Sequence, residues 1–251
     1  MHKVQILMYH RVGHYPGRVR QHGAAYCDLP RFRAQMQMFK WLGYQVISLD
    51  QAMEGLQGTG PLPAKAMVLT FDDAYADFLE NAAPVLLQHQ YPATVYAVSG
   101  MLGRTSEWDR GSGPEPAPLM TAAQLREVQQ LGFTVGSHTK NHLRLAEQTP
   151  DTVHTELKDS KMALEDILGQ SVHHLCYPYG SHNLATLHAS NEAGYLTAAT
   201  CQRAAATAAD DLLSLPRKAI SRGDSLLGVY WKMAFKNQAK TPAVRRAPAL
   251  T

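Results

Sequence analysis

The sequence contains few cysteines, and their arrangement excludes two kinds of site. Cys27, Cys176 and Cys201 are the only cysteines among 251 residues, and no two of them form a CxxC pair. An odd number of widely spaced cysteines argues against a disulfide framework and against a zinc site built from thiolates. We therefore expect the chain to work in a reducing compartment.

Long apolar runs are also lacking. The run at the N-terminus, Val4–Tyr9, is soon followed by Arg11. It is too short for the core of a signal peptide and far too short to span a bilayer. We expect no stable membrane insertion. The expected location is the cytoplasm for the chain as given, or the periplasm or the cell exterior if a leader has been removed.

Neither sign of charge dominates the sequence. Lysine and arginine number 24 against 21 aspartates and glutamates, which gives a net charge of +3. A surplus this small gives no general argument for an anionic partner. We expect no nucleic acid partner.

Apolar side chains, in contrast, are plentiful enough for a sizeable core, at 45% of the residues. A chain of this length and composition predicts one large α/β domain, which we place at residues 1–235. The remaining residues, 236–251, are basic, contain prolines and lack acidic residues. This composition predicts a disordered tail.

Short apolar, β-branched runs alternate with helical patterns along the chain. Such alternation predicts parallel β/α units, arranged as a barrel or as a doubly wound sheet, with the chemistry at the C-terminal ends of the strands. Two long loops, Arg11–Asp28 and Gly103–Pro118, are expected over one mouth of the fold. The predicted strands are Val4–Tyr9, Gln45–Ser48, Met67–Phe71, Thr94–Val98, Phe133–Gly136 and His174–Tyr177, and the predicted helices are Leu29–Leu42, Ala74–His89, Thr121–Gln130 and Pro150–Gly169.

Two adjacent carboxylates, Asp72 and Asp73, end the third of these predicted strands. Side by side they repel each other, and a bound cation or a hydrogen-bond network would relieve that cost. An N-cap followed by an acidic first helical turn would also explain the pair, without any function. The pair alone leaves both interpretations open.

Two histidines, His138 and His142, follow another predicted strand. A four-residue separation on a helical turn would bring both imidazoles to one face, as in zinc-binding pairs. His10 and His14 share this spacing, so spacing alone is weak, and surface histidines are the alternative. Both the histidine and the aspartate pair sit at strand ends, however, and two histidines with one carboxylate complete the protein ligands of an open catalytic metal site.

The predicted strand His174–Tyr177 ends in a Pro-aromatic-Gly turn, which by itself is only a turn. The order of all these motifs resembles the polysaccharide deacetylases, the NodB-homology group of carbohydrate esterase family 4, and in particular the subset related to poly-N-acetylglucosamine deacetylases. The resemblance runs from about position 4 to position 218. The motifs that carry it are Met8-Tyr9-His10-Arg11-Val12, Phe71-Asp72-Asp73, His138-xxx-His142 and Tyr177-Pro178-Tyr179-Gly180.

The resemblance implies a deformed (β/α)7-type barrel that removes N-acetyl groups from N-acetylhexosamines. It assigns one divalent metal ion to Asp73, His138 and His142, and the role of general base to Asp72. Zinc is the expected metal, although the same ligands accept cobalt, nickel or iron. A metal that polarises the acetamide beside a carboxylate that takes a proton from water is a sound arrangement for hydrolysis.

The remaining roles follow the family less directly. The turn at Pro178 and Tyr179 is expected to hold the oxyanion through a backbone amide. The late Leu-x-His motif that supplies the acid in commoner members is absent, because Leu215-Pro216-Arg217 stands there. We therefore assign the acid to His10, as in the poly-N-acetylglucosamine subset, although His10 could instead simply cap the end of the first strand.

Cys176 occupies the position of a family arginine that orients the base, and a thiol cannot do that work. Arg217 or Arg11 is expected to pair with Asp72 instead. Trp108, in the second long loop, is expected either to stack on a sugar at the pocket rim or to anchor the loop.

The predicted function is metal-dependent de-N-acetylation of N-acetylhexosamine units in a polysaccharide or a lipid-linked glycan, in exopolysaccharide biosynthesis. Two alternatives are a catalytically silent module that binds carbohydrate and another metal-dependent hydrolase on the same barrel. The other metal-dependent hydrolase, for example a phosphoesterase, is weakened as an alternative because no Gly-rich phosphate loop or further ligand cluster is evident in the sequence.

Overall fold

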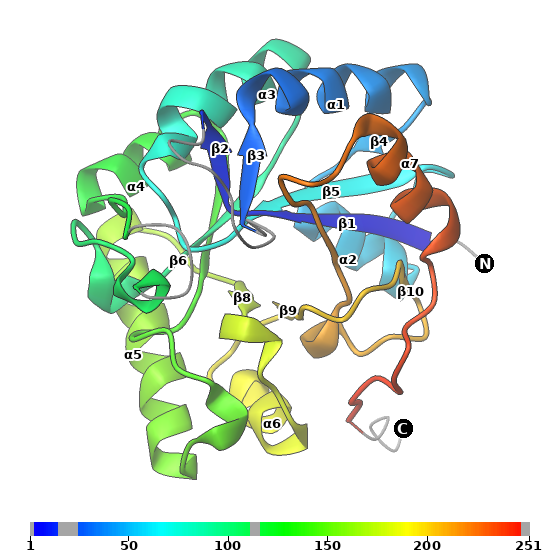
Figure 1. The fold of residues 1–251 in the computed structure, drawn as a ribbon. Helices are drawn as coiled ribbons and strands as arrows, with labels where there is room; N and C mark the ends of the chain where they lie inside the picture. The colour runs from blue at the N-terminus through cyan, green and yellow to red at the C-terminus, as the bar shows by residue number, and fades with distance from the viewer. Residues whose placement is uncertain (1–2, 15–24, 111–115, 247–251) are drawn as a thin grey trace.

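The computed structural model describes residues 3–14, 25–110 and 116–246. Within these ranges strands and helices alternate along the chain, as the sequence predicts (Figure 1). The strands are β1 (Lys3–Tyr9), β2 (Arg11–Gly13), β3 (Tyr26–Asp28), β4 (Gln45–Val46), β5 (Ala66–Phe71), β6 (Thr94–Ala97), β7 (Thr134–Ser137), β8 (His174–Cys176), β9 (Thr197–Ala199), β10 (Ala206–Thr207) and β11 (Lys218–Ala219). The α-helices are α1 (Leu29–Trp41), α2 (Leu49–Gln57), α3 (Ala83–His89), α4 (Ala122–Gln130), α5 (Pro150–Leu168), α6 (Leu184–Glu192) and α7 (Leu226–Phe235).

The main sheet curls into a deformed barrel. Strands β1, β5, β6, β7, β8 and β9 lie side by side and parallel in that order, β4 adds to β5, and β10 runs antiparallel to β1. The late segment from Leu215 to Ala219 joins the two ends of this series. Leu215 bridges to Ala199 of β9, and β11 pairs in parallel with β1. The predicted fold class, an α/β deformed barrel, is confirmed.

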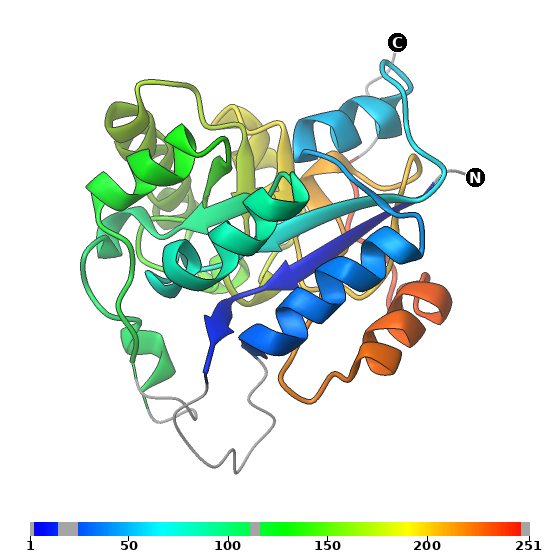
Figure 2. The ribbon, with the colours of Figure 1, turned by 90° about the horizontal axis from the view of Figure 1, so that it is seen from above.

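The two faces of the sheet bury different side chains, because successive residues of a strand point to opposite sides. Leu7, Leu69 and Val95 belong to a large apolar cluster shared with helix residues such as Phe32 and Leu157. Alternate positions of the same strands form a second cluster, which faces the inside of the barrel. Its members include Val4, Ile6, Ala66, Val68, Tyr96, Cys176 and Ala199. Helix α2 contributes Leu49, Ala52 and Leu56 to this second cluster, so it lies on the opposite side of β1 and β5 from α1 (Figure 2).

Helix ends follow the capping residues in the sequence. Thr121 begins α4, as predicted; it accepts a hydrogen bond from the Gln124 N–H and forms a reciprocal capping box with Gln124. The Thr149 side chain caps α5 by accepting a hydrogen bond from the Thr152 N–H, and Gly169 ends that helix in the left-handed conformation. Helices α2, α6 and α7 were not predicted, although Ser48, Asn183 and Ser225 cap their N-termini.

The prediction of a helix over Ala74–His89 is wrong in its first half. Asp73 and Ala74 have φ angles of 70° and 51°, a left-handed conformation that cannot start an α-helix. The chain instead turns, forms one π-helical turn at Phe78–Ala82 and only then enters α3. Asp72 and Asp73 are therefore not the N-cap and first turn of a helix.

The prediction of a disordered tail differs from the structure up to Arg246. Arg246 pairs with Asp211 through its guanidinium and its backbone N–H, and the Val244 carbonyl accepts a hydrogen bond from Ser214. These contacts hold residues 236–246 against the domain, and residues 247–251 lie outside the described ranges. Among the helices of those ranges, none combines the length and the apolar character needed to cross a bilayer.

Candidate active site

Side chains that point into the barrel continue past the ends of three parallel strands. The inward positions of β5 are Ala66, Val68 and Thr70, so the next inward position is Asp72. The same two-residue step carries β1 to His10 and β7 to His138. These polar side chains therefore gather at the mouth of the barrel, where the C-terminal ends of parallel strands meet.

Asp73, His138 and His142 form the candidate metal centre. The Oδ1 atom of Asp73 lies 3.3 Å from Nε2 of His138 and 3.3 Å from Nε2 of His142. All three residues are buried. Asp73 Oδ1 has no hydrogen-bond partner among the described residues, because neither contact has hydrogen-bond geometry. A metal ion requires ligand atoms that converge on one point without hydrogen-bonding to one another, and these three atoms meet that requirement.

The spacing of these atoms fits a divalent ion. Bonds of about 2.0–2.1 Å in tetrahedral geometry place ligand atoms roughly 3.3–3.4 Å apart. The three atoms also lie within 4.8 Å of one another as a set. Two imidazoles and one carboxylate leave a position for water or substrate. The residues therefore fit a catalytic metal site.

Left-handed residues bring these ligands together, and this corrects the predicted geometry. His138 and His142 lie in a loop, not on a helical turn, and Thr139 and His142 have φ angles of 64° and 59°. Asp73, at φ 70°, is likewise turned back toward the mouth after leaving β5. Non-glycine residues adopt this conformation at a cost, so its occurrence at Asp73 and His142 and directly after His138 points to function.

The loop between the two histidines is held by Glu156 of α5, a residue that the sequence interpretation missed. Its buried carboxylate accepts hydrogen bonds from the backbone N–H groups of Lys140 and Asn141, at 3.0 and 2.8 Å, and from the Asn141 side chain. A signal was present in the sequence, because Glu156 lies one helical turn from Val153 and Ser160 on the buried face of α5.

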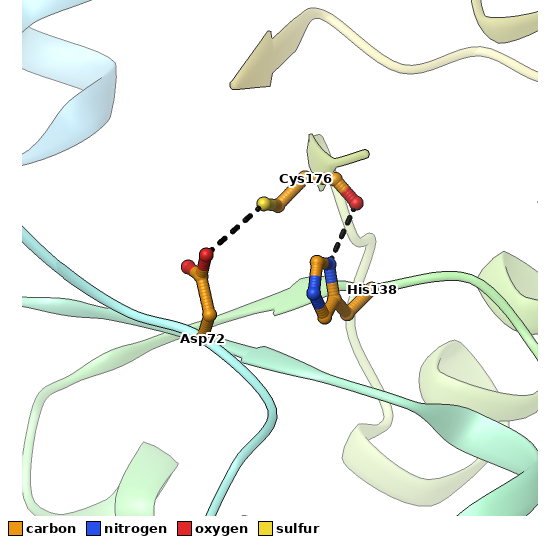
Figure 3. Close-up of side chains that lie close together, drawn as sticks. All are labelled: Asp72, His138 and Cys176. Carbon is orange, nitrogen blue, oxygen red and sulfur yellow. Dashed lines mark hydrogen bonds between the residues drawn. The ribbon is translucent and has the colours of Figure 1, made fainter. Parts of the chain in front are cut away.

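Hydrogen bonding also sets the orientation of the His138 ring. Its Nδ1 lies 2.7 Å from the carbonyl oxygen of Cys176 and donates to it, as Figure 3 shows, so Nε2 faces Asp73. Burial lowers the pKa of His142 and keeps its imidazole neutral, the form that binds a metal. Burial alone would raise the pKa of Asp73, but the two histidines outweigh it and hold that pKa well below its usual range.

Asp72 points to the other side of the mouth and is held by Arg217. The guanidinium makes a two-pronged contact, with Nη1 2.6 Å from Oδ1 and Nη2 2.7 Å from Oδ2. Nη1 also donates to Thr70, and Nε donates to the Thr200 carbonyl. Burial would raise the pKa of Asp72, but the charge of Arg217 outweighs it and lowers that pKa, so the carboxylate stays ionised.

Of the two arginines predicted to pair with Asp72, the structure places only Arg217 there. Arg11 donates instead to Asp77, at 2.8 Å, because β2 carries it away from the barrel mouth. Cys176 packs against the Asp72–Arg217 ion pair. Its Sγ lies 3.5 Å from Asp72 Oδ2 (Figure 3). The same Sγ lies 3.0 Å from Arg217 Nη2, so the thiol contacts both partners of the ion pair.

His10 faces Asp72 from the end of β1. Its Nε2 lies 4.0 Å from Asp72 Oδ2, and its side chain is partly exposed. The buried Nδ1 of His10 has no hydrogen-bond partner in the part of the chain that the structure describes. The histidine therefore adjoins the carboxylate and opens toward solvent.

Three further predicted residues line the same mouth. Tyr179, at φ 59°, lies in the turn after β8, and its ring is 4.7 Å from that of His142. Pro178 is buried beneath this turn. Trp108 stacks on His142 at 4.1 Å between ring centres, and its loop is tied down by the hydrogen bond from Tyr75 to Asp109. Trp108 thus anchors a loop and also forms one wall of the site.

The barrel and its strand-end ligands define the class of protein: an α/β barrel with a candidate one-metal centre at its mouth. The model of the family named polysaccharide deacetylase matches residues 59–198, more than half of the chain. The chain therefore belongs to the polysaccharide deacetylase family, whose members are hydrolases of carbon–nitrogen bonds. The predicted family and enzyme class are confirmed.

Individual relatives agree with this assignment. The Bacillus subtilis protein YxkH, named after the same family, is 29% identical over 91% of this chain and 76% of its own length. The poly-β-1,6-N-acetyl-D-glucosamine N-deacetylase of Escherichia coli K12 is 36% identical over 44% of this chain, but that match spans only 18% of its length. The structure of the Streptococcus pyogenes deacetylase PplD in complex with acetate superposes with a TM-score of 0.78, at 30% identity over 92% of this chain and 98% of that one.

Proposed function

We propose that this protein is a metal-dependent de-N-acetylase, which hydrolyses the acetamide of N-acetylhexosamine units in a polysaccharide or lipid-linked glycan and releases acetate. The observation that carries the proposal is the convergence of Asp73, His138 and His142 beside a separate ionised carboxylate, Asp72. The substrate named for the Escherichia coli relative, poly-N-acetylglucosamine, supports the choice of sugar.

Asp73, His138 and His142 would hold the divalent ion, with zinc as the first choice and cobalt, nickel or iron as alternatives. When bound, such an ion supplies a Lewis acid that polarises the acetamide oxygen and lowers the pKa of a coordinated water to about 7. The protein residues provide the proton transfers and the orientation.

Asp72 takes the proton of the attacking water. Its depressed pKa means that the carboxylate is ionised and ready to accept, and Arg217 is the positioning residue that fixes both of its oxygens. The Oδ2 atom, which Cys176 also contacts, faces His10 across 4.0 Å. The proposed base, Asp72, and the proposed acid, His10, therefore lie side by side, where both can reach one acetamide group.

His10 donates the proton that the amine leaving group needs. Its Nε2 lies close enough to Asp72 to protonate the nitrogen on the carbon that the water attacks, so that the C–N bond breaks and the free amine leaves, and its partly exposed side chain can exchange protons with solvent. The backbone amide of Tyr179, in the turn begun by Pro178, is the proposed donor to the oxyanion. Trp108 would contact the sugar with whatever ring surface His142 leaves uncovered.

The test is acetate release by the purified, metal-analysed protein from N-acetylglucosamine oligomers, measured beside phosphate release from a generic phosphomonoester. We expect acetate, with stoichiometric appearance of free amine. Binding of the oligomers without acetate release would instead support a silent carbohydrate-binding module. Phosphate release would support another metal-dependent hydrolase.

Replacing Arg217 by methionine should destabilise the fold and slow the reaction together. Removing one partner of a buried ion pair leaves the other charge uncompensated, which costs about 3–5 kcal/mol. Urea denaturation of the metal-free protein measures this loss. Because a lysine cannot reproduce the two-pronged contact, Arg217→Lys should recover little of the activity.

The double variant Arg217→Met with Asp72→Asn tests whether the pair itself is responsible. Removing both charges should restore most of the free energy of unfolding but none of the activity. A single Arg217→Met variant as stable and as active as wild type would contradict the positioning role.

A further inference from the structure

Helix α7 exposes a row of large apolar side chains that the barrel does not need. Val229 and Met233 anchor the helix in the core. On the opposite side Leu227, Trp231 and Phe235, spaced four residues apart, are 79%, 48% and 67% exposed, and Leu226 and Tyr230 flank them. The helix lies beside α1 at the margin of the molecule (Figure 2).

The segment that contains α7 is also the basic part of the chain. From Ser225 to the C-terminus the sequence has five lysines and arginines and no acidic residue, whereas the preceding 224 residues hold two more acidic than basic residues. The net charge of +3 for the whole chain conceals this division. The Lys236 ammonium lies 4.1 Å from the Trp231 ring centre, so positive charge sits directly on the aromatic row.

We propose that this face of α7 docks on an anionic lipid surface. Tryptophan and tyrosine prefer the boundary between headgroups and acyl chains, where the ring is apolar and its polar edge stays wet. Leucine and phenylalanine add apolar area that enters the boundary, and Lys236 can extend its ammonium to the phosphates. The helix lies in the plane of the interface and does not cross it, in agreement with its ten residues.

A second copy of the chain fits this face less well. A twofold dimer places the same patch on both subunits, so the Lys236 ammonium groups of the two copies would be brought to one interface. An anionic bilayer instead complements the apolar row and the positive charge together. Lys232 contributes less, because it is already paired with Asp224 at 2.7 Å.

The test is co-sedimentation with vesicles of phosphatidylcholine, with and without phosphatidylglycerol. We expect binding that requires phosphatidylglycerol and weakens with salt. The triple variant Leu227→Gln, Trp231→Gln, Phe235→Gln should bind at least tenfold more weakly. Lys236→Gln should bind about fivefold more weakly, the effect of one basic residue at an anionic surface.

Matched substitutions elsewhere provide the controls. Met162→Gln and Leu196→Gln remove exposed apolar side chains outside α7, and Lys158→Gln removes an exposed charge on α5. These variants should bind as wild type does, and thermal unfolding checks that every variant is folded. The result does not depend on the proposed deacetylase activity.

Two outcomes would overturn the proposal. One is the absence of sedimentation with either kind of vesicle, or equal sedimentation of the triple variant and wild type. The other is a dimer in analytical ultracentrifugation that the triple variant dissociates, which would make the face an interface between copies of the chain.

Discussion

Replacing Asp72 by asparagine should reduce acetate release by about 10²–10⁴-fold, the usual contribution of general acid–base catalysis, while the metal content stays unchanged. Asparagine keeps the shape of the side chain but cannot accept a proton from water. The proposed metal ligands are Asp73, His138 and His142, and Asp72 is not one of them. The substitution therefore leaves all three ligands in place. Steady-state kinetics and metal analysis on the same preparation measure the two quantities.

The reduction should fall on kcat more than on KM, since the base acts in the transition state and not in binding the sugar. Asp159→Asn is a suitable control, because this carboxylate is partly exposed and pairs with Lys140 on the surface. An Asp72→Asn variant with nearly wild-type kcat would mean that another group takes the proton. Loss of metal in the variant would mean that Asp72 is a ligand.

The part of the site that follows strand register could be predicted from the sequence. The strands have a period of two, and parallel strands all deliver their last residues to one end of the barrel. Asp72 and His138 therefore had to lie near each other once Met67–Phe71 and Phe133–Gly136 were identified as strands.

The rest depends on features without a local pattern. The left-handed conformations of Asp73, Thr139 and His142 are imposed by tertiary contacts such as those of Glu156. The residue types at these positions do not predict a left-handed conformation. The choice of Arg217 over Arg11 depends on which of two short segments closes the barrel, and this is a matter of long-range pairing. Local composition likewise did not indicate that residues 236–246 find partners in Asp211 and Ser214.

Replacing His138 by alanine should abolish stoichiometric metal binding, and with it acetate release. The imidazole is one of the three proposed protein ligands, and loss of an outer partner of a ligand already costs about 10- to 100-fold in metal affinity. His138 is also the best-fixed of the three, since its backbone N–H donates to Ala97 and its Nδ1 to Cys176. Elemental analysis after dialysis, together with acetate release, measures the effect.

The comparison of this variant with chelated wild type separates ligation from structure. Wild type stripped by a chelator should regain activity when zinc is restored, whereas His138→Ala should regain it only at much higher zinc concentrations, because two ligands bind more weakly than three. His154→Ala, which removes an exposed histidine of α5, should behave as wild type throughout. If His138→Ala retained both metal and activity, the ion would have to be bound elsewhere. Asp72, His138 and Cys176 also bring possible ligand atoms together, but this group requires His138 as well and would be excluded by the same result.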